Sequence, residues 1–205
     1  MPSSACCVLD EIGLSVGGRI RWGEEVPSSM PGVYVVSLSH DPTANFGCLA
    51  EAPISLPAVE GWLAIVPSLS LDGVVQPPAD RLADFLNSFW LPDEDIVYIG
   101  KATRLRSRLS QLFRHRLGDR RPHAGGHWVK TLACLQKLHV YFSECESVEQ
   151  AAAKETSALD AFVVRVSKET RALLPAPHLA IPFANREHPH GNRKQKRLSH
   201  DVVLP

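Results

Sequence analysis

The stretch DIVYIGKATRLRSRLSQLF (residues 95–113) determines the fold. Its first six residues are mostly apolar and end at Gly100, which predicts a strand. From Thr103 onward, leucines recur at a spacing of three and four residues, which predicts an amphipathic helix over residues 103–117. The face of this helix that packs on the core is expected to carry Leu105, Leu109, Leu112, Phe113 and Leu117.

The flanking sequence predicts two further strands, PGVYVVSLS (31–39) and LHVYFSEC (138–145), and helices over 78–90, 127–137 and from residue 147 onward. We therefore expect an α/β (α+β) fold with a small, three-stranded, mainly antiparallel sheet flanked by helices. Residues 1–30 would be an N-terminal extension, 31–185 the main domain and 186–205 a basic tail, mostly loop. Residues 40–94, rich in Pro, Gly and Ser, would be an irregular or partly β insertion between the first two strands.

Composition restricts the class of protein. The chain has 205 residues, enough for a sizeable core, and no window that resembles a membrane span or a secretory signal. Its five cysteines are odd in number and contain no Cys-x-x-Cys pair. This pattern predicts a cytoplasmic protein without a disulfide framework or a cysteine zinc site.

The net charge of zero conceals a strong asymmetry. Residues 1–100 contain three basic and thirteen acidic residues, a net of −10, and residues 101–205 contain nineteen basic and nine acidic residues, a net of +10. Such a basic half indicates a polyanionic partner, with DNA as the candidate. The alternative is a solvated basic face that the acidic half neutralises within the fold.

The helix SVEQAAAKETSALDAFVV (147–164) has one residue that does not fit its pattern. Ser147 and Gln150 can form a capping box at its start. Glu155 falls in the apolar stripe, four residues after Ala151 and four before Leu159. A carboxylate directed at a core costs several kcal/mol unless it is paired, so we expect a partner for Glu155.

The helix after residue 100 is rich in arginine. At about 100° per residue, its polar flank is expected to carry Arg104, Arg108, Gln111 and His115. Arg108 lies at the edge of the apolar stripe, from where a forked guanidinium could reach a phosphodiester. The alternative is an ordinary basic surface on which Arg108 extends from the edge of the core.

Two tripeptides make this arginine more informative: GVY (32–34) and YIG (98–100). The chain resembles the GIY-YIG nuclease family, whose name comes from two such tripeptides on adjacent strands. Residues 98–113 are similar to the nuclease domain at the start of the bacterial excision-repair incision enzyme. Leu105 and Arg108 occupy the family's leucine and arginine positions.

The resemblance extends over residues 31–39 and 95–185. The family's single metal-binding glutamate matches Glu155 in AAAKETSAL (151–159), and its late asparagine after a proline matches Asn185 in PFAN (182–185). Two features depart from the family pattern. About sixty residues separate the tripeptides instead of a short hairpin, and Leu112 stands where the family often has His or Tyr, a role that His115, His123 or His127 could take.

The resemblance implies a DNA endonuclease, restriction-like or structure-specific, that uses Mg²⁺ (or Mn²⁺) bound by Glu155. Tyr34 would orient or deprotonate the attacking water, Arg108 would hold the scissile phosphate, and the remaining catalytic candidates would assist them: Tyr98, Lys101 and Asn185. The candidates for binding the substrate are Arg104, His115, Arg120, Arg121, His123 and His127. A homodimer would supply two active sites for two strands.

Other interpretations remain open. The segment RRPHAGGHW (120–128) either grips a DNA phosphate or is a glycine-rich loop before a buried helix, and a zinc site at His123 and His127 or at His188 and His190 is a weaker alternative. The tail GNRKQKR (191–197) would add nonspecific phosphate contacts. As a whole, the chain could also be a noncatalytic DNA-binding module that retains the nuclease fold, or an interaction protein that uses its acidic half.

Overall fold

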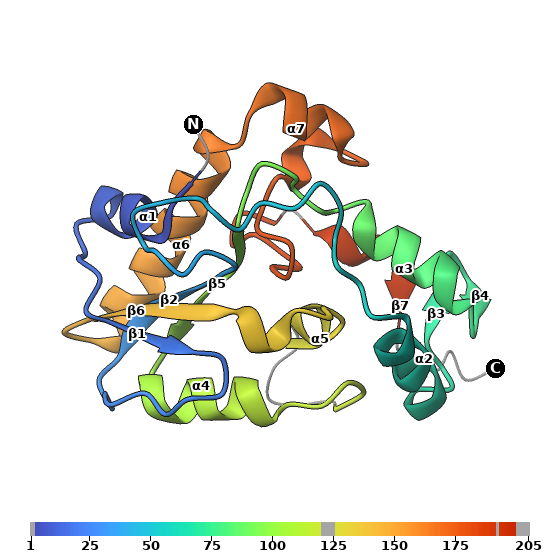
Figure 1. The fold of residues 1–205 in the computed structure, drawn as a ribbon, viewed down its shortest axis with the longest axis horizontal. Coiled ribbons are helices and arrows are strands. Elements are labelled where there is room, and N and C mark those ends of the chain that lie inside the picture. Colours follow the sequence, from blue (N-terminus) through green and yellow to red (C-terminus); the bar gives the residue numbers. More distant parts are fainter. Residues whose placement is uncertain (1–2, 120–125, 192, 200–205) are drawn as a thin grey trace.

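The computed structural model describes residues 3–119, 126–191 and 193–199, and its central element is an antiparallel sheet (Figure 1). The sheet has four strands in the order β1-β6-β2-β5. These strands are β1 (Gly18–Arg21), β6 (His139–Glu144), β2 (Gly32–Ser37) and β5 (Ile96–Ala102). The prediction of a mixed α/β fold with an antiparallel sheet is confirmed, but the prediction of three strands is wrong. The additional strand β1 lies in the N-terminal extension, and only Ile20 of its four residues is buried.

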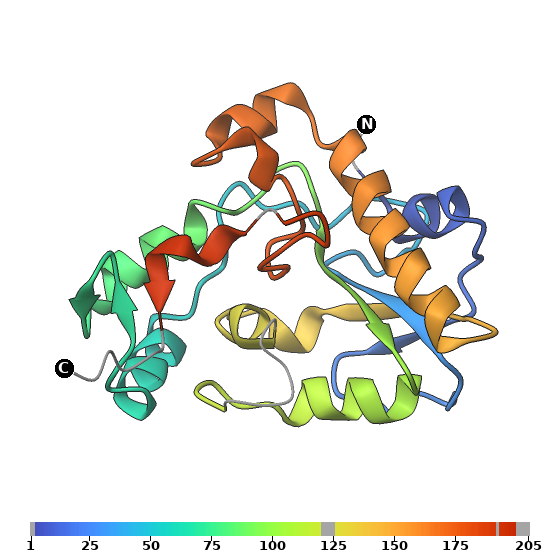
Figure 2. The same cartoon turned by 180° about the vertical axis from the view of Figure 1, so that it is seen from behind.

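Helices cover both faces of the sheet. Successive residues of a strand face opposite sides, so Tyr34 and Val36 of β2 join one buried cluster, and Val33 and Val35 join the other. Helix α4 (Leu105–Arg114) packs with the first cluster, and α1 (Ala5–Glu11) and α6 (Val148–Arg165) pack with the second. Figures 1 and 2 show α4 along one side of the sheet, opposite α1 and α6.

The segment predicted as an irregular or partly β insertion contains two helices and two short strands. It contains α2 (Leu56–Ile65), β3 (Ser70–Leu71), β4 (Val74–Val75) and α3 (Ala79–Asn87). The tail, predicted to be mostly loop, returns to this segment through η3 (Lys194–Arg197) and β7 (Leu198–Ser199), which completes a second sheet in the order β4-β3-β7. Figure 1 shows these elements together on the side of the molecule away from α1.

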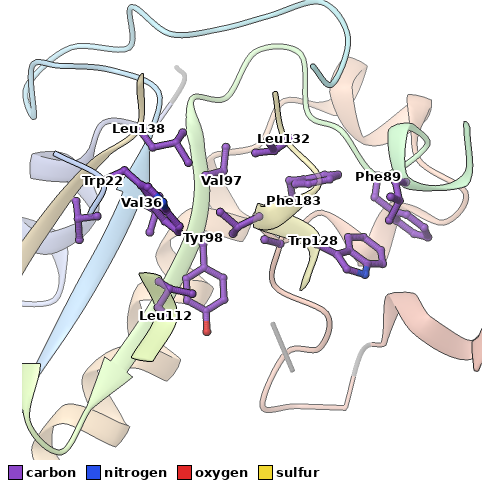
Figure 3. Close-up of a cluster of buried hydrophobic side chains, with 14 of the residues drawn as sticks. Trp22, Val36, Phe89, Val97, Tyr98, Leu112, Trp128, Leu132, Leu138 and Phe183 are labelled. Carbon is purple, nitrogen blue, oxygen red and sulfur yellow. The ribbon is translucent and has the colours of Figure 1, made fainter. Parts of the chain in front are cut away.

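One apolar cluster connects this second group of elements to the central sheet. Figure 3 shows it extending from Trp22 and Val36 through Val97 to Trp128 and Phe89. Burying one large apolar side chain contributes about 1.5–3 kcal/mol, so the segment 40–94 contributes substantially to the same core as α4.

Four further short helices complete the described part of the chain. They are α5 (Gly126–Lys130), η1 (Leu135–Lys137), α7 (Lys168–Leu173) and η2 (Pro177–Leu179). The helix predicted over 127–137 is therefore two short helices, α5 and η1, separated by a turn that pairs with Ile54 through Leu132. Among the described helices, none is long and apolar enough to cross a bilayer.

Candidate active site

Strands β2 and β5 bring the two tripeptides together as antiparallel neighbours. Tyr34 is opposite Gly100 and Val36 is opposite Tyr98, which confirms that GVY and YIG lie on adjacent strands. The two tyrosine rings have centroids 5.9 Å apart. A Cβ atom at Gly100 would lie 2.7 Å from the Tyr98 ring and 2.8 Å from the Tyr34 hydroxyl. Glycine is therefore needed at this position for the two rings to approach each other.

Both tyrosines are buried, and their surroundings define what their hydroxyl groups can do. Burial raises the pKa of Tyr34 well above its ordinary value; Tyr98 and Glu155 raise it further, and Arg108 opposes them. Burial and Glu155 also raise the pKa of Tyr98, against Arg108. Arg108 and Glu155 are thus close enough to act electrostatically on both rings. In this environment the phenols stay protonated at neutral pH and can donate hydrogen bonds.

Glu155 has the partner that its position in the apolar stripe requires. Helix α6 begins after Ser147, whose Oγ accepts a hydrogen bond from the Gln150 amide. Two turns later, Glu155 Oε1 accepts a hydrogen bond from the Lys101 amide, and Oε2 lies 3.1 Å from Lys101 Nζ. The Glu155 side chain is 17% exposed. The carboxylate therefore lies at the carboxyl end of β5, where it can be reached from solvent, and not inside the core.

A depression of about 240 Å³ lies beside this carboxyl end. Most of its lining comes from the end of β5 and from α4, and it includes three of the predicted site residues: Lys101, Arg104 and Arg108. Gln111 and Ser107 add neutral polar groups to the same wall. The depression is open and has three cationic side chains in its lining, which suits a phosphate group.

Asn185 acts on the free edge of β5. Its Oδ1 accepts a hydrogen bond from the Ile99 amide at 2.9 Å, and its Nδ2 donates to the Ile99 carbonyl at 2.8 Å. The preceding Ala184 amide donates to the Val97 carbonyl. The Asn185 side chain thus replaces a strand neighbour at the YIG tripeptide. It is buried, so it holds the strand in place and does not line the depression.

Two predicted substrate-binding residues lie elsewhere. Helix α4 ends at Arg114, so His115 leaves the helical periodicity and does not share the polar flank of Arg104 and Arg108. The prediction that His115 shares this polar flank is wrong. His115 and His127 are buried, with ring centroids 4.6 Å apart, and His127 stacks on Trp62. Burial lowers the pKa of His115. Three other candidates fall outside the described residues: Arg120, Arg121 and His123.

The sequence prediction also missed a residue. Arg186 follows Asn185, and its charge acts on Tyr98. Burial lowers the pKa of Arg186. Helical or strand periodicity does not identify this arginine, but its position directly after the predicted site residue Asn185 could have marked it as a candidate.

The residues around Glu155 fit a weakly held divalent cation. Mg²⁺ prefers oxygen ligands and keeps several waters, and it is often bound by one carboxylate together with substrate phosphates. Within the described residues, Glu155 belongs to no group of three side chains that could hold a metal ion. One accessible carboxylate beside a cationic depression large enough for a phosphate group therefore suits an ion that binds together with its substrate.

Comparison of the chain with protein families, curated proteins and solved structures finds no match. The function must consequently be inferred from the residues and geometry of this corner of the sheet.

Proposed function

We propose that the chain is a metal-dependent DNA endonuclease of the GIY-YIG type that hydrolyses phosphodiester bonds. The observation that carries the proposal is the convergence of two buried tyrosines with Arg108 and Glu155 at the carboxyl end of β5. Phosphodiester hydrolysis needs a held phosphate, an oriented water and stabilisation of developing negative charge, and the residues of this corner can supply each of these.

The cationic wall would bind the substrate. Arg104 and Arg108 line the same depression, and a guanidinium can hold two phosphate oxygens at once. Arg108 also acts electrostatically on Tyr34 and Tyr98. It would therefore hold the scissile phosphate next to the tyrosines and offset charge in the transition state.

The tyrosines would orient the attacking water. The raised pKa of Tyr34 disfavours a tyrosinate in this state, so the environment supports the orienting role over the role of general base. Tyr98 would hydrogen-bond Tyr34 or the same water. Asn185 would keep the YIG strand in register through its two bonds to Ile99.

Glu155 would hold Mg²⁺ or Mn²⁺, and when bound this ion supplies positive charge that polarises the phosphodiester and stabilises the leaving 3′ oxygen. The Lys101 ammonium, 3.1 Å from the carboxylate, would then turn toward the substrate phosphate. The hydrogen bond from the main-chain amide of Lys101 to Glu155 can persist and keep the carboxylate oriented.

One observation favours a second candidate, a noncatalytic DNA-binding module with the same fold. The ion pair between Lys101 and Glu155 already neutralises the carboxylate without a metal ion. A protein that only binds DNA could keep this ion pair permanently and still use Arg104 and Arg108 for phosphate contacts.

Plasmid cleavage with and without Mg²⁺ tests the proposal. We expect metal-dependent nicking by the wild type and a loss of about 10³-fold or more in Glu155→Ala and Tyr34→Phe, in the range of other groups that act in the transition state. Glu149→Ala, on the exposed first turn of α6, is the matched control and should cleave normally. Binding to DNA without cleavage of plasmid or branched substrates would favour the binding module, and no affinity for DNA would favour an interaction protein.

A further inference from the structure

A second cluster of ligating side chains lies where α6 meets the segment that follows Asn185. Asp160 is on α6, and His188 and His190 come from the turn after Asn185. One ligand atom from each of the three lies within 4.8 Å of the others. In the described part of the chain, no other such group of His, Cys, Asp and Glu occurs.

The Asp160 carboxylate contacts both imidazoles. Its Oδ1 lies 3.2 Å from His188 Nε2, and its Oδ2 lies 3.6 Å from His190 Nε2. The two imidazole centroids are 4.9 Å apart. Ligands bound at about 2.0–2.2 Å in a tetrahedral zinc site are separated by roughly 3.3–3.6 Å. The 3.2 Å separation of Asp160 Oδ1 and His188 Nε2 is near this value, and His190 approaches the other oxygen of the same carboxylate.

His188 provides an independent indication of a ligand. Its side chain is 5% exposed, and its Nε2 atom has no hydrogen-bond partner among the described residues, because the contact with Asp160 lacks the geometry of a hydrogen bond. A buried polar atom without a partner is unfavourable, so a ligand that engaged this nitrogen would stabilise it. Of the charged or titratable groups that act on His188, Asp160 brings a negative charge and His190 is the second imidazole of the cluster.

We propose that Asp160, His188 and His190 form a Zn²⁺ site whose fourth position is open to water. Two imidazoles and one carboxylate suit zinc better than magnesium, which prefers oxygen ligands. This site is independent of the endonuclease proposal, because none of its residues lines the depression beside Glu155. Zinc there would join the segment after Asn185 to the helix that carries Glu155.

The hydrogen bonds of His188 determine how tightly zinc binds. His188 Nδ1 accepts a hydrogen bond from the His190 amide at 3.2 Å, so the proton of the neutral ring is on Nε2. When Nε2 binds zinc, that proton moves to Nδ1 and the bond from the His190 amide is lost. We therefore expect the site to bind zinc more weakly than a closed site with four protein ligands.

Competition with a chromophoric zinc chelator, using the full-length protein, tests the site. We expect one equivalent of Zn²⁺ per chain and an affinity at least about 100-fold lower in His190→Gln and in Asp160→Asn, since even outer partners of zinc ligands contribute 10–100-fold. His178→Gln, an exposed histidine on η2, is the matched control and should bind zinc as the wild type does. Zinc should also raise the Tm of the wild type and of His178→Gln, but not that of the two ligand variants.

The decisive variants are those of His190 and Asp160, because both residues are exposed and can be replaced without opening the core. Absence of zinc binding, or equal affinity in the ligand variants, would overturn the proposal. The cluster would then be only a contact between the Asp160 carboxylate and the two imidazoles. Co²⁺ in place of zinc gives a second readout. A thiolate-to-cobalt absorption band would assign the ion to cysteine and would also overturn the proposal, whereas a spectrum without that band supports nitrogen and oxygen ligands.

Discussion

The chain contains two basic regions that look alike in sequence and have different roles in the fold. On and beside α4, Arg104 and Arg108 line an open depression. In the tail, Lys194 is 2% exposed and Arg197 forms an ion pair with Asp72. The expectation that the whole of GNRKQKR binds phosphate therefore does not match these two residues. A positive charge indicates a polyanion partner only where the fold leaves it without an internal acceptor.

The largest contrast is expected from Arg108→Lys. Lysine keeps the charge but loses the two-pronged geometry, so DNA cleavage should fall about 10²–10³-fold with little change in the free energy of unfolding. The matched control is Arg106→Lys on the same helix, because the Arg106 guanidinium contacts Glu25 and the Val26 carbonyl instead. Single-turnover cleavage and urea denaturation measure the two effects. Equal losses of cleavage in the two variants would mean that Arg108 has no special role.

Lys194→Met should have the opposite effects: a lower free energy of unfolding and little change in DNA cleavage. Lys194 Nζ donates to the carbonyls of Ile181, Pro182 and Phe183 at 2.9, 2.8 and 3.1 Å. Methionine keeps most of the stem but leaves three buried carbonyls without a donor, and we expect a loss of about 2 kcal/mol in the free energy of unfolding. Lys168→Met, at an exposed position, should change it by less than about 0.5 kcal/mol. An unchanged stability of Lys194→Met in urea denaturation would show that the ammonium does not hold the tail.

The same contrast explains which parts of the structure the sequence could predict. Strands β2, β5 and β6 are nearly continuous apolar runs, and helices α3, α4 and α6 carry apolar residues at helical spacing. The predicted positions of these elements agree with the structure. Strand β1 has one buried residue, and α2 includes Pro57 and Gly61, so neither has a readable pattern. The pairing of Arg197 with Asp72 joins residues 125 positions apart, and no local pattern reveals such a contact.

The candidate site shows a similar division. Tyr34, Tyr98, Arg108 and Glu155 were predicted from a combined motif, and the fold brings them to one corner of the sheet. His115 was placed on the polar flank from helical periodicity, and that periodicity ends at Arg114. A helical-wheel projection assigns a residue to the wrong face once the helix has ended, and the last residue of a helix is poorly defined by sequence.

The salt dependence of DNA binding gives a smaller but more direct test of the two regions. Each phosphate contact removed should lower the slope of log K against log salt by about one. Arg104→Gln should therefore reduce the slope by about one, whereas Arg197→Gln should leave it nearly unchanged, because Arg197 is engaged with Asp72. Fluorescence anisotropy at several salt concentrations measures both slopes. A reduced slope in Arg197→Gln would place the tail in the DNA interface and remove the distinction between the two basic regions.

The smallest effect concerns the pH range over which the Arg197 contact exists. Hydrogen bonding to Arg197 lowers the pKa of Asp72 below its usual value of 3.8. Because the pKa of this carboxyl is lower in the folded chain, its stabilising effect is complete above the unfolded value and is lost as the pH falls through the folded value. The wild type should therefore have a slightly higher Tm than Asp72→Asn at neutral pH, and the difference should vanish only in acid below about pH 4. If the Tm difference at Asp72 disappeared already near neutral pH, the tail would be held by other contacts, and Arg197 would have to be counted with the arginines of α4 as a residue that DNA can recruit.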